Sequence, residues 1–472
     1  MKKVFTLGVP AVILIAFVIV YSWGCQADPI ATEDVWNTIK ADSNEGGAVV
    51  QDVAEIPLDE VYDASEMILD HATAEFFGHY AIDDSFLSWI YSNYGAATLI
   101  ALAEESQKEK PDAEAWYELT GSSIHVLWLE YNQELGLRQD ELALVHWKDC
   151  ASEDEVVLDF TGDINFSEGW ETTEYMDAQS GGIYDCFSMN LLQEMNDADI
   201  LMVNNEFTYS TRGTALEGKA YTFRADPSRV SLLNVFGTDL VGIANNHMYD
   251  YGPEALVDSL DILDHAGMPH TGAGRNISQA EQPVYFIANG RKIAIIAATQ
   301  IERTYNYTKE ATETEPGVLK TLNAARYVAA IERVRENSDY VIAFVHWGTE
   351  GTHQYGADQV NLAKQFVAAG ADVIIGGHTH CLQGIQYMDG VPIIYSLGNF
   401  WFSSETLDTG IAQVRIQEDG TIRFRFIPCL QQEYKTSLVT DATEKQRVLD
   451  FMESISTDVS YDADGYVIDM SQ

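Results

Sequence analysis

The polar side chains of residues 245–250 are the part of the sequence best suited to chemistry. An apolar run at 240–243 predicts a buried strand, and Asn245, Asn246, His247 and Asp250 follow it closely. A glycine and a proline then begin the next segment. Ligands of open α/β sheets bind beyond the carboxyl ends of strands, so these side chains indicate a site. A polar turn that caps the following helix is the alternative interpretation.

Four other apolar runs end in polar clusters of the same kind. The runs at 156–160, 200–203, 340–345 and 373–375 lead into these residues: Asp163 and Asn165, Glu206, His346 and Glu350, and His378 and His380. Taken alone, each of these residues is more often a helix cap or a partner of backbone groups than a ligand. Because five strands repeat the pattern, we expect these side chains to converge at one edge of a sheet.

The residue types of these clusters are those of a metal site. The candidate ligands are Asp163, Glu206, Asn246, His346, His378 and His380. Such a mixture of oxygen and nitrogen ligands suits manganese, iron or zinc, whereas calcium and magnesium prefer oxygen alone. Six ligands exceed the need of one tetrahedral zinc, so we expect two divalent ions that share a carboxylate. Gly162 and the Gly376-Gly377 pair predict places where the backbone passes close to a ligand.

The remaining polar residues are assigned to the chemistry or to the surroundings of the ions. His247 follows the expected ligand Asn246, so its imidazole should project toward the substrate as an acid or a charge stabiliser, with Asp250 holding the ring. A His247 that only hydrogen-bonds its own loop is the alternative. The residues expected to orient ligands or to line the pocket are Asn165, Asn245, Glu350 and Asn399.

The elements that position these residues follow from alternating strand and helix patterns between about residues 156 and 430. Such alternation predicts an α/β fold with helices packed on the faces of a sheet. Residues 226–233 and 361–367 are amphipathic, and Asp419-Gly420 predicts a hairpin turn. In the last segment, 431–472, we expect a helix from about 443 to 455 and then a polar tail.

The N-terminal part predicts a membrane anchor at residues 1–25. Lys2 and Lys3 precede a charge-free run at 4–23, which is long enough to cross a bilayer once. The positive-inside rule then places the body of the protein outside the cytoplasm. The residues before Cys25 resemble the cleavage box of bacterial lipoproteins, so lipid attachment there is the alternative. Either outcome tethers the protein to the outer face of the cell membrane.

Two further segments lie between the anchor and the α/β region. Residues 26–57 are rich in alanine, acidic residues and glycine, as is typical of a flexible tether. Residues 58–138 carry apolar residues at spacings of three and four, which predicts a small helical module. Its aromatic residues could line a glycan or peptide groove, but at helical spacing they favour a core.

The amino-acid composition argues against some classes of ligand and against a disulfide framework. The 472 residues include 73 acidic and 27 basic ones, giving a net charge of −46, which argues against nucleic acid and anionic lipid as ligands. The five cysteines show no paired spacing, so no disulfide framework is expected.

The order of the motifs resembles the bacterial capsule synthesis family called CapA, or PgsA in poly-γ-glutamate producers. The motifs are Gly-Asp163, Asn-Glu206, Ala-Asn-Asn246-His247, His346-Trp-Gly, Gly-His378-Thr-His380 and Ser-Leu-Gly-Asn399-Phe. The family is similar to calcineurin-like metallophosphoesterases, which implies a four-layer sandwich of two mixed sheets flanked by helices over about residues 156–430. Those enzymes usually open with Asp-x-His, whereas this chain has Asp163-Ile-Asn165, and Glu206 replaces their bridging aspartate.

The resemblance implies a membrane-anchored, extracytoplasmic protein in the synthesis, export or release of poly-γ-glutamate or a related capsule polymer. Its partners would be the membrane, ligase or export subunits, and an anionic polymer or phosphoester substrate. One hypothesis is a hydrolase or transferase whose dinuclear centre cuts a phosphoester or an amide of that polymer. A second is a non-catalytic accessory subunit of a membrane-bound polyglutamate ligase, and a third is a phosphoesterase that resembles 5′-nucleotidases.

Overall fold

The computed structural model describes residues 84–108, 114–120, 122, 124, 127, 128, 131, 145–303 and 305–471. The expected anchor and tether, 1–25 and 26–57, lie outside these residues, as does most of the helical module. Within the described part of the chain, no helix is both long enough and apolar enough to span a membrane. The chain divides into two compact units, which are described separately.

The first unit is described by two helices, α5 (Asp84–Tyr94) and α6 (Ala96–Ser106). Gly95 separates them with φ 85°, a conformation that glycine adopts without strain. Phe86, Leu87 and Ile90 of α5 and Leu99 of α6 are fully buried. These aromatic and aliphatic residues therefore form core, as the helical spacing predicts.

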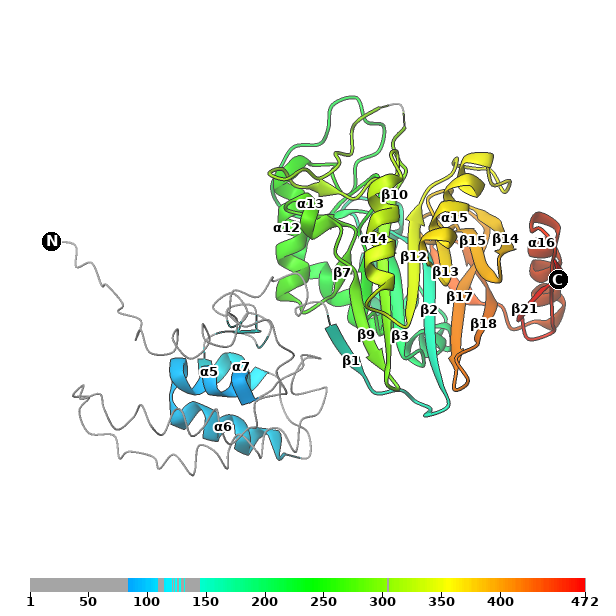
Figure 1. Ribbon diagram of the computed structural model, residues 1–472. Coiled ribbons are helices and arrows are strands. Elements are labelled where there is room, and N and C mark those ends of the chain that lie inside the picture. Colours follow the sequence, from blue (N-terminus) through cyan, green and yellow to red (C-terminus); the bar gives the residue numbers. More distant parts are fainter. Residues whose placement is uncertain are drawn as a thin grey trace, which may run out of the picture. The chain divides into compact units, whose positions relative to one another are not determined.

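The second unit contains two large mixed sheets (Figure 1). The seven-stranded sheet has the order β1 (Val145–Lys148), β9 (Val284–Ala288), β10 (Arg291–Thr299), β12 (Tyr340–His346), β13 (Val373–Gly377), β15 (Val391–Leu397) and β14 (Leu382–Met388). The eight-stranded sheet has the order β19 (Lys435–Leu438), β18 (Ile422–Gln432), β17 (Leu407–Gln417), β2 (Glu155–Ile164), β3 (Ile200–Asn205), β6 (Leu240–Gly242) and β7 (His270–Thr271), with β16 (Asn399–Trp401) paired to β2. The expected α/β fold with two mixed sheets and helices is therefore confirmed.

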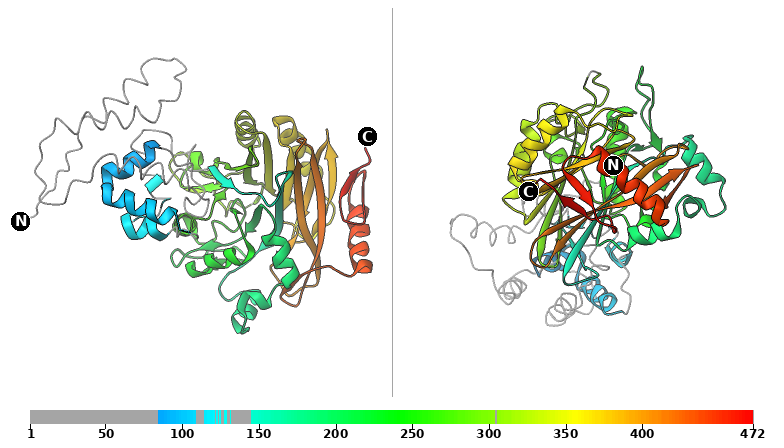
Figure 2. Two further views of the ribbon diagram at one scale, coloured as in Figure 1. Left: turned by 90° about the horizontal axis from the view of Figure 1, so that it is seen from below. Right: turned by 90° about the vertical axis from the view of Figure 1, so that its right-hand side faces the viewer.

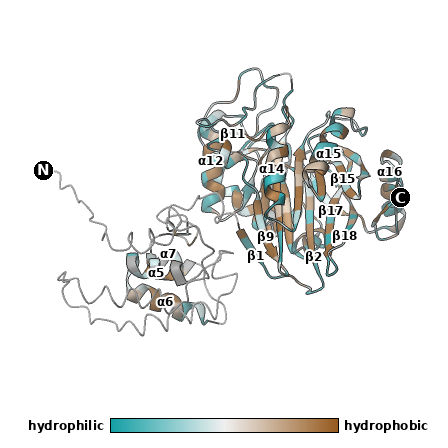
Figure 3. Cartoon of the chain, viewed as in Figure 1, coloured by the Kyte–Doolittle hydropathy of each residue, from teal (hydrophilic) through white to brown (hydrophobic). Residues whose placement is uncertain are grey.

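Three hydrophobic clusters hold these elements together. One lies between the sheets and joins residues such as Phe160 of β2 to Ile295 of β10 and Phe344 of β12. A second packs β2, β3 and β6 against the helices α11 (Met189–Asn196) and α12 (Gly252–His265). The third packs β10, β12 and β13 against α14 (Ala325–Arg335) and α15 (Ala357–Ala369). Figure 3 accordingly shows the central strands as mainly apolar.

Several short elements complete the second unit. They are α7 (Glu114–Thr120), α10 (Glu171–Ala178), η1 (Gly182–Asp185), β4 (Thr208–Tyr209), β5 (Arg224–Ala225), η2 (Pro227–Phe236), β8 (Ala273–Gly274), α13 (Ile277–Ala280) and β11 (Gly317–Val318). The amphipathic segment expected at 226–233 is the 3-10 helix η2. Asp226 caps it by accepting a hydrogen bond from the Ser228 amide, and Pro227 follows at the first position, a combination typical of helix starts.

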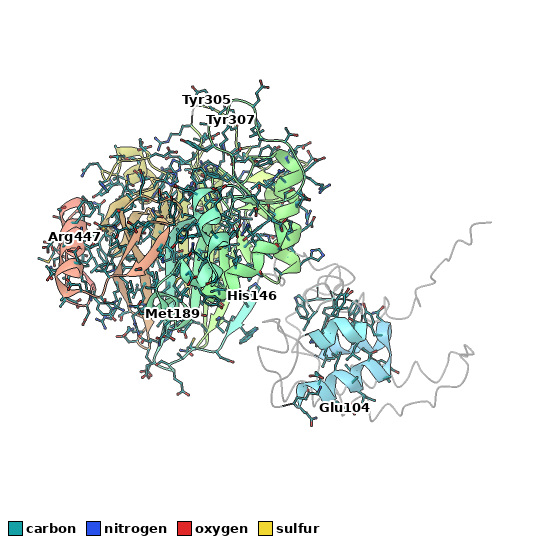
Figure 4. The ribbon with its side chains drawn as sticks, turned by 180° about the vertical axis from the view of Figure 1, so that it is seen from behind. Glu104, His146, Met189, Tyr305, Tyr307 and Arg447 are labelled. Atoms are coloured by element: carbon teal, nitrogen blue, oxygen red, sulfur yellow. The ribbon has the colours of Figure 1, made fainter. Side chains whose placement is uncertain are left out.

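The C-terminal segment differs in part from expectation. The helix expected at about 443–455 is α16 (Ala442–Ile455), capped by the carboxylate of Asp441. A hairpin of β20 (Val459–Tyr461) and β21 (Val467–Asp469) follows where a polar tail was expected. Figure 2 shows these elements in red beside the strands β17 and β18. Arg447 of α16 (labelled in Figure 4) pairs with Asp408 of β17 at 2.7 Å.

Candidate metal centre

The ends of five neighbouring strands bring the site together. Asp163 is the next-to-last residue of β2, Glu206 follows β3, and Asn246 lies four residues after β6. From the other sheet, His346 ends β12 and His378 follows β13. The register aligns Asp163 with Asn204 of β3, and His346 with Gly377 of β13. The carboxyl ends of these parallel strands therefore deliver their side chains to one place.

The six residues proposed as ligands lie within short distances of one another. His346 Nε2 lies 2.8 Å from Asn246 Oδ1, 3.2 Å from His378 Nδ1 and 3.3 Å from Glu206 Oε1. His380 Nδ1 lies 3.7 Å from Asp163 Oδ2.

Two groups of three emerge, and both have ligand atoms within 4.8 Å of one another. The first is Glu206, His346 and His378, and the second is Asp163, Glu206 and His380. Glu206 belongs to both groups, so its carboxylate is placed between two potential ion positions.

The environment of Glu206 fits a cation. Its side chain is fully buried, and neither carboxylate oxygen accepts a hydrogen bond from a described residue. Burial raises the pKa of Glu206 well above its ordinary value, and the nearby carboxylate of Asp163 acts in the same direction. A buried charge of this kind is costly unless it is paired or coordinates a metal. The donor set of carboxylates, an amide oxygen and imidazoles therefore fits divalent ions of the manganese, iron or zinc type.

The imidazoles are held in the protonation state that metal binding requires. Burial lowers the pKa values of His346 and His378 well below 6.5, and the neighbouring histidines contribute to both shifts. Neutral imidazole is the form that coordinates a metal. His378 and His380 also adopt positive φ angles of 95° and 56°. For a residue other than glycine, such a backbone conformation costs roughly 1–3 kcal/mol. Strained backbone of this kind clusters at functional sites.

His247 lies beside the cluster and is oriented by Asp250. Its Nδ1 lies 2.6 Å from Asp250 Oδ2, while its Nε2 lies 3.9 Å from Glu206 Oε1. Burial lowers the pKa of His247, and Asp250 opposes that shift. The ring packs against Phe223, with centroids 4.3 Å apart. Asp250 thus holds the imidazole through Nδ1, and Nε2 lies on the side of Glu206.

Lys219 is a site residue that the sequence analysis missed. Its side chain is 7% exposed, and its Nζ lies 2.5 Å from Asp250 Oδ1 and donates a hydrogen bond to the carbonyl of Asn246. Glu302 Oε1 lies 3.5 Å from the same nitrogen. Lys219 therefore fixes both the expected ligand loop and the partner of His247. It stands in a loop with no strand or helix pattern, so spacing gave no signal for it.

Asn204 was missed as well, although a signal existed. Its Nδ2 donates a hydrogen bond of 2.6 Å to Asp163 Oδ1 and lies 3.3 Å from His346 Nδ1. It precedes Asn205-Glu206 at the end of β3 and lies on the same face as Asp163. The alternation of strand side chains could have indicated this position.

The residues expected to orient ligands or to line the pocket have three different settings. Asn245 donates to the carbonyl of Asn205 at 2.9 Å and accepts from the amide of His247, so it holds the loop. Asn399 Oδ1 lies 2.7 Å from His380 Nδ1 and orients that ring. Glu350 Oε1 lies 3.8 Å from His378 Nε2, on a side chain that is 63% exposed, so it lies at the solvent-facing rim.

The glycines near the site have a different role from the one expected. A Cβ at Gly162 would lie 2.0 Å from the carbonyl oxygen of Gly398, and one at Gly376 would lie 2.0 Å from that of Tyr395. The backbone passes close to neighbouring strands at these points, and the expectation of close approach to a ligand was wrong for them. Gly377 alone borders the site, because its Cβ would lie 3.1 Å from Asp163 Oδ1.

Known proteins are similar in sequence to part of this chain. The chain is 33% identical over 232 residues to a protein of Bacillus anthracis named capsule biosynthesis protein CapA, covering 48% of this chain and 55% of that one. It is 30% identical over 235 residues to the PGA biosynthesis protein CapA of Bacillus subtilis, covering 49% and 61%. A probable polyglutamine synthesis accessory protein of Mycobacterium tuberculosis is 24% identical over 213 residues, covering 44% and 56%. The chain thus spans a little over half the length of these relatives.

Solved structures resemble the chain only weakly. A hypothetical protein from Thermus thermophilus aligns with a TM-score of 0.37 at 15% identity, over 59% of this chain and 100% of that one. The 5′-nucleotidase of Candida albicans aligns with a TM-score of 0.33 at 12% identity, over 59% and 52%. Likenesses of this size carry no conclusion about function.

The family model described as "Bacterial capsule synthesis protein PGA_cap" matches residues 157–404. This range begins in β2 and ends after β16, and it contains every strand end that contributes to the cluster. More than half of the chain is matched, so the protein belongs to the bacterial capsule synthesis family PGA_cap.

Proposed function

We propose that the cluster binds two divalent cations and that the protein hydrolyses a phosphoester or amide bond of a capsule polymer of the poly-γ-glutamate type. One observation carries this proposal: the buried carboxylate of Glu206 has no hydrogen-bond partner among the described residues and is shared by two groups of potential ligands. Asp163, His380 and Glu206 would hold one ion, and Glu206, His346, His378 and Asn246 the other. The two-sheet fold would then be a four-layer sandwich of the metallophosphoesterase type.

The bound ions would supply electrophilic activation of the scissile group and of water. The side chains of the protein would transfer the proton and hold the groups that do so in place. His247 Nε2 would take a proton from the attacking water and return it to the leaving oxygen or nitrogen. Asp250 would keep the proton of His247 on Nδ1, and Lys219 would fix Asp250 in place. The carbonyl of Asn246 accepts from Thr308 Oγ1 at 2.6 Å as well as from Lys219, so its loop is held from two sides.

The names of the relatives support the substrate class and the setting. Two are named for capsule or PGA biosynthesis, so we propose that the substrate is an anionic surface polymer. We further propose that the protein acts outside the cytoplasm, held to the membrane by its N-terminal segment, beside ligase or export subunits. The net charge of −46 means that an anionic polymer would approach the site only with cations present.

The proposal is tested by incubating the metal-loaded full-length protein with γ-linked polyglutamate and, separately, with simple phosphomonoesters and phosphodiesters. Chromatography of the products should show cleavage of one class by the wild type and none by His378→Ala. Glu313→Gln serves as a control, because this exposed carboxylate lies outside the cluster. Absence of cleavage of every substrate by a fully metal-loaded protein would refute the hydrolase.

A second candidate function is a non-catalytic accessory role in polymer synthesis. The relative from Mycobacterium tuberculosis is named a probable accessory protein, and that name favours this candidate. Under it, His247→Ala would leave polymer output in cells unchanged, whereas loss of the metal ligand His378 would reduce output through loss of structure. Under the hydrolase, both variants would change output.

A further inference from the structure

The side-chain amide of Asn165 forms a hydrogen bond through its oxygen but, within the described residues, none through its nitrogen. Its Oδ1 accepts a hydrogen bond of 2.8 Å from the backbone N–H of Ser167. Because a backbone N–H can only donate, the atom that it meets is the oxygen, and this fixes the orientation of the amide. The Nδ2 group is fully buried and has no hydrogen-bond partner in the described part of the chain.

Strand alternation places Asn165 on the face of the sheet that carries the expected ligand Asp163. Its neighbours Ile164 and Phe166 both belong to the hydrophobic cluster on the outer face of the eight-stranded sheet. Side chains alternate between faces along an extended chain, so Asp163 and Asn165 share the opposite face. The backbone remains extended there, because the Asn165 amide donates to the carbonyl of Trp401 at 3.1 Å. Asn165 therefore stands roughly 7 Å beyond Asp163 along the same strand line.

An unpaired N–H₂ group at this place does not suit a cation. Asparagine coordinates metals through its oxygen, and that oxygen is already occupied by Ser167. A buried donor without a partner is unfavourable, and native proteins usually pair such groups. An acceptor oxygen of a bound ligand, on the face of the sheet that carries Asp163, would satisfy this donor.

We propose that Asn165 Nδ2 donates a hydrogen bond to a negatively charged oxygen of the substrate, the phosphoryl or carbonyl oxygen on which charge grows during bond cleavage. This inference rests on the proposed function, because it needs an oxyanion placed beside the ions. Asn165 is then a catalytic residue that contacts the reacting group, with its orientation set in advance by Ser167. A preorganised donor of this kind stabilises the transition state more than the bound substrate.

Two variants test the role. Asn165→Asp keeps the shape and the acceptor for the Ser167 amide but replaces the donor with an oxygen. Asn165→Ala removes both ends without adding a charge. Ser167→Ala is the matched control, since it removes a buried hydroxyl without a partner from the same loop and keeps the backbone N–H.

Calorimetric titration of the metal-loaded full chain with inorganic phosphate gives a readout that needs no turnover. We expect the wild type and Ser167→Ala to bind phosphate equally, and both Asn165 variants to bind it at least about tenfold more weakly. Metal content should be unchanged in all four proteins. If a substrate is cleaved, kcat of the Asn165 variants should fall by about a hundredfold or more.

Other outcomes overturn the inference. Unchanged phosphate affinity in both Asn165 variants would remove the donor role, and so would a wild type that binds metal but no phosphate. Loss of metal from Asn165→Ala, with a native circular dichroism spectrum, would make Asn165 a ligand instead. A wild type that binds metal and phosphate but cleaves nothing would overturn the hydrolase, while weaker phosphate binding by the Asn165 variants would still support the donor.

Discussion

Replacing Glu206 with glutamine should change stability in opposite directions in the absence and in the presence of metal. Without metal, the ionised carboxylate is buried beside the like charge of Asp163 and has no hydrogen-bond partner in the described part of the chain. Glu350 also disfavours its ionisation, and Lys219 favours it. Glutamine keeps the shape and removes the charge. We expect the metal-free Glu206→Gln protein to be more stable than the wild type by about 1–3 kcal/mol near pH 7.5, the usual cost of an unsatisfied buried polar group.

The pH dependence of Glu206 ionisation sets the direction and the upper limit of its effect on stability. Because the pKa of Glu206 is raised in the folded protein, the folded state binds this proton more tightly than the unfolded state does. The stability that it contributes is complete below its ordinary value of 4.5 and is lost as pH rises through the raised value. From 4.5 to 7.5 there are three pH units of about 1.36 kcal/mol each, so the effect at pH 7.5 cannot exceed about 4 kcal/mol. The stability of the metal-free Glu206→Gln variant should lack this decrease with rising pH.

Denaturant unfolding of the full chain, followed by circular dichroism, measures both effects. With chelator, the difference between variant and wild type should grow from pH 5.5 to pH 7.5. With metal at about a hundred times its dissociation constant, the wild type should gain about 2.7 kcal/mol and the variant should gain much less. Glu313→Gln is the control, because this exposed carboxylate lies outside the cluster and should leave metal-free stability unchanged. A variant that is less stable in chelator yet keeps the full metal-dependent gain would refute the reasoning.

Four further predictions address other parts of the molecule. His247→Ala should retain metal, as measured by mass spectrometry, yet lower turnover by roughly a hundredfold or more; equal metal loss from His247→Ala and His378→Ala would make His247 a ligand. In the metal-free wild type the contribution of His378 to stability should be lost as pH falls below 6.5, because its pKa is lowered in the folded state, so the stability of His378→Ala relative to the wild type should rise over that range in urea titrations. Gly376→Ala should lower the thermal midpoint, because its Cβ would lie 2.0 Å from a carbonyl oxygen; an unchanged midpoint would show that the strands can separate. Deletion of residues 1–24 should yield a chain that leaves the membrane fraction, and a truncated chain still bound to membranes would disprove the anchor.

Strand ends were the most predictable part of the protein. Each ligand candidate follows an apolar run, and buried parallel strands read as such runs. The six candidates could therefore be named from the sequence, and the structure brings Asp163, Glu206, Asn246, His346, His378 and His380 together.

Residues whose role depends on tertiary contacts could not be found in this way. Lys219 reaches Asp250 and Asn246 from a loop, and no spacing in the sequence encodes that contact. Gly162 and Gly376 were assigned to a ligand, although strand packing explains them, because a sequence shows that a Cβ is absent and not what takes its place. The C-terminal hairpin was missed because β20 and β21 are each three residues long, too short for a period of two to stand out.

Metal analysis of the purified full-length protein tests the central claim most directly. After equilibration with manganese, iron or zinc and exhaustive dialysis, inductively coupled plasma mass spectrometry should find about two ions per chain in the wild type. Glu206→Gln should hold fewer, because its carboxylate is common to both groups of ligands. Stoichiometric metal in a folded variant that lacks Glu206, His346 and His378 together, or no bound metal in the wild type, would contradict the account.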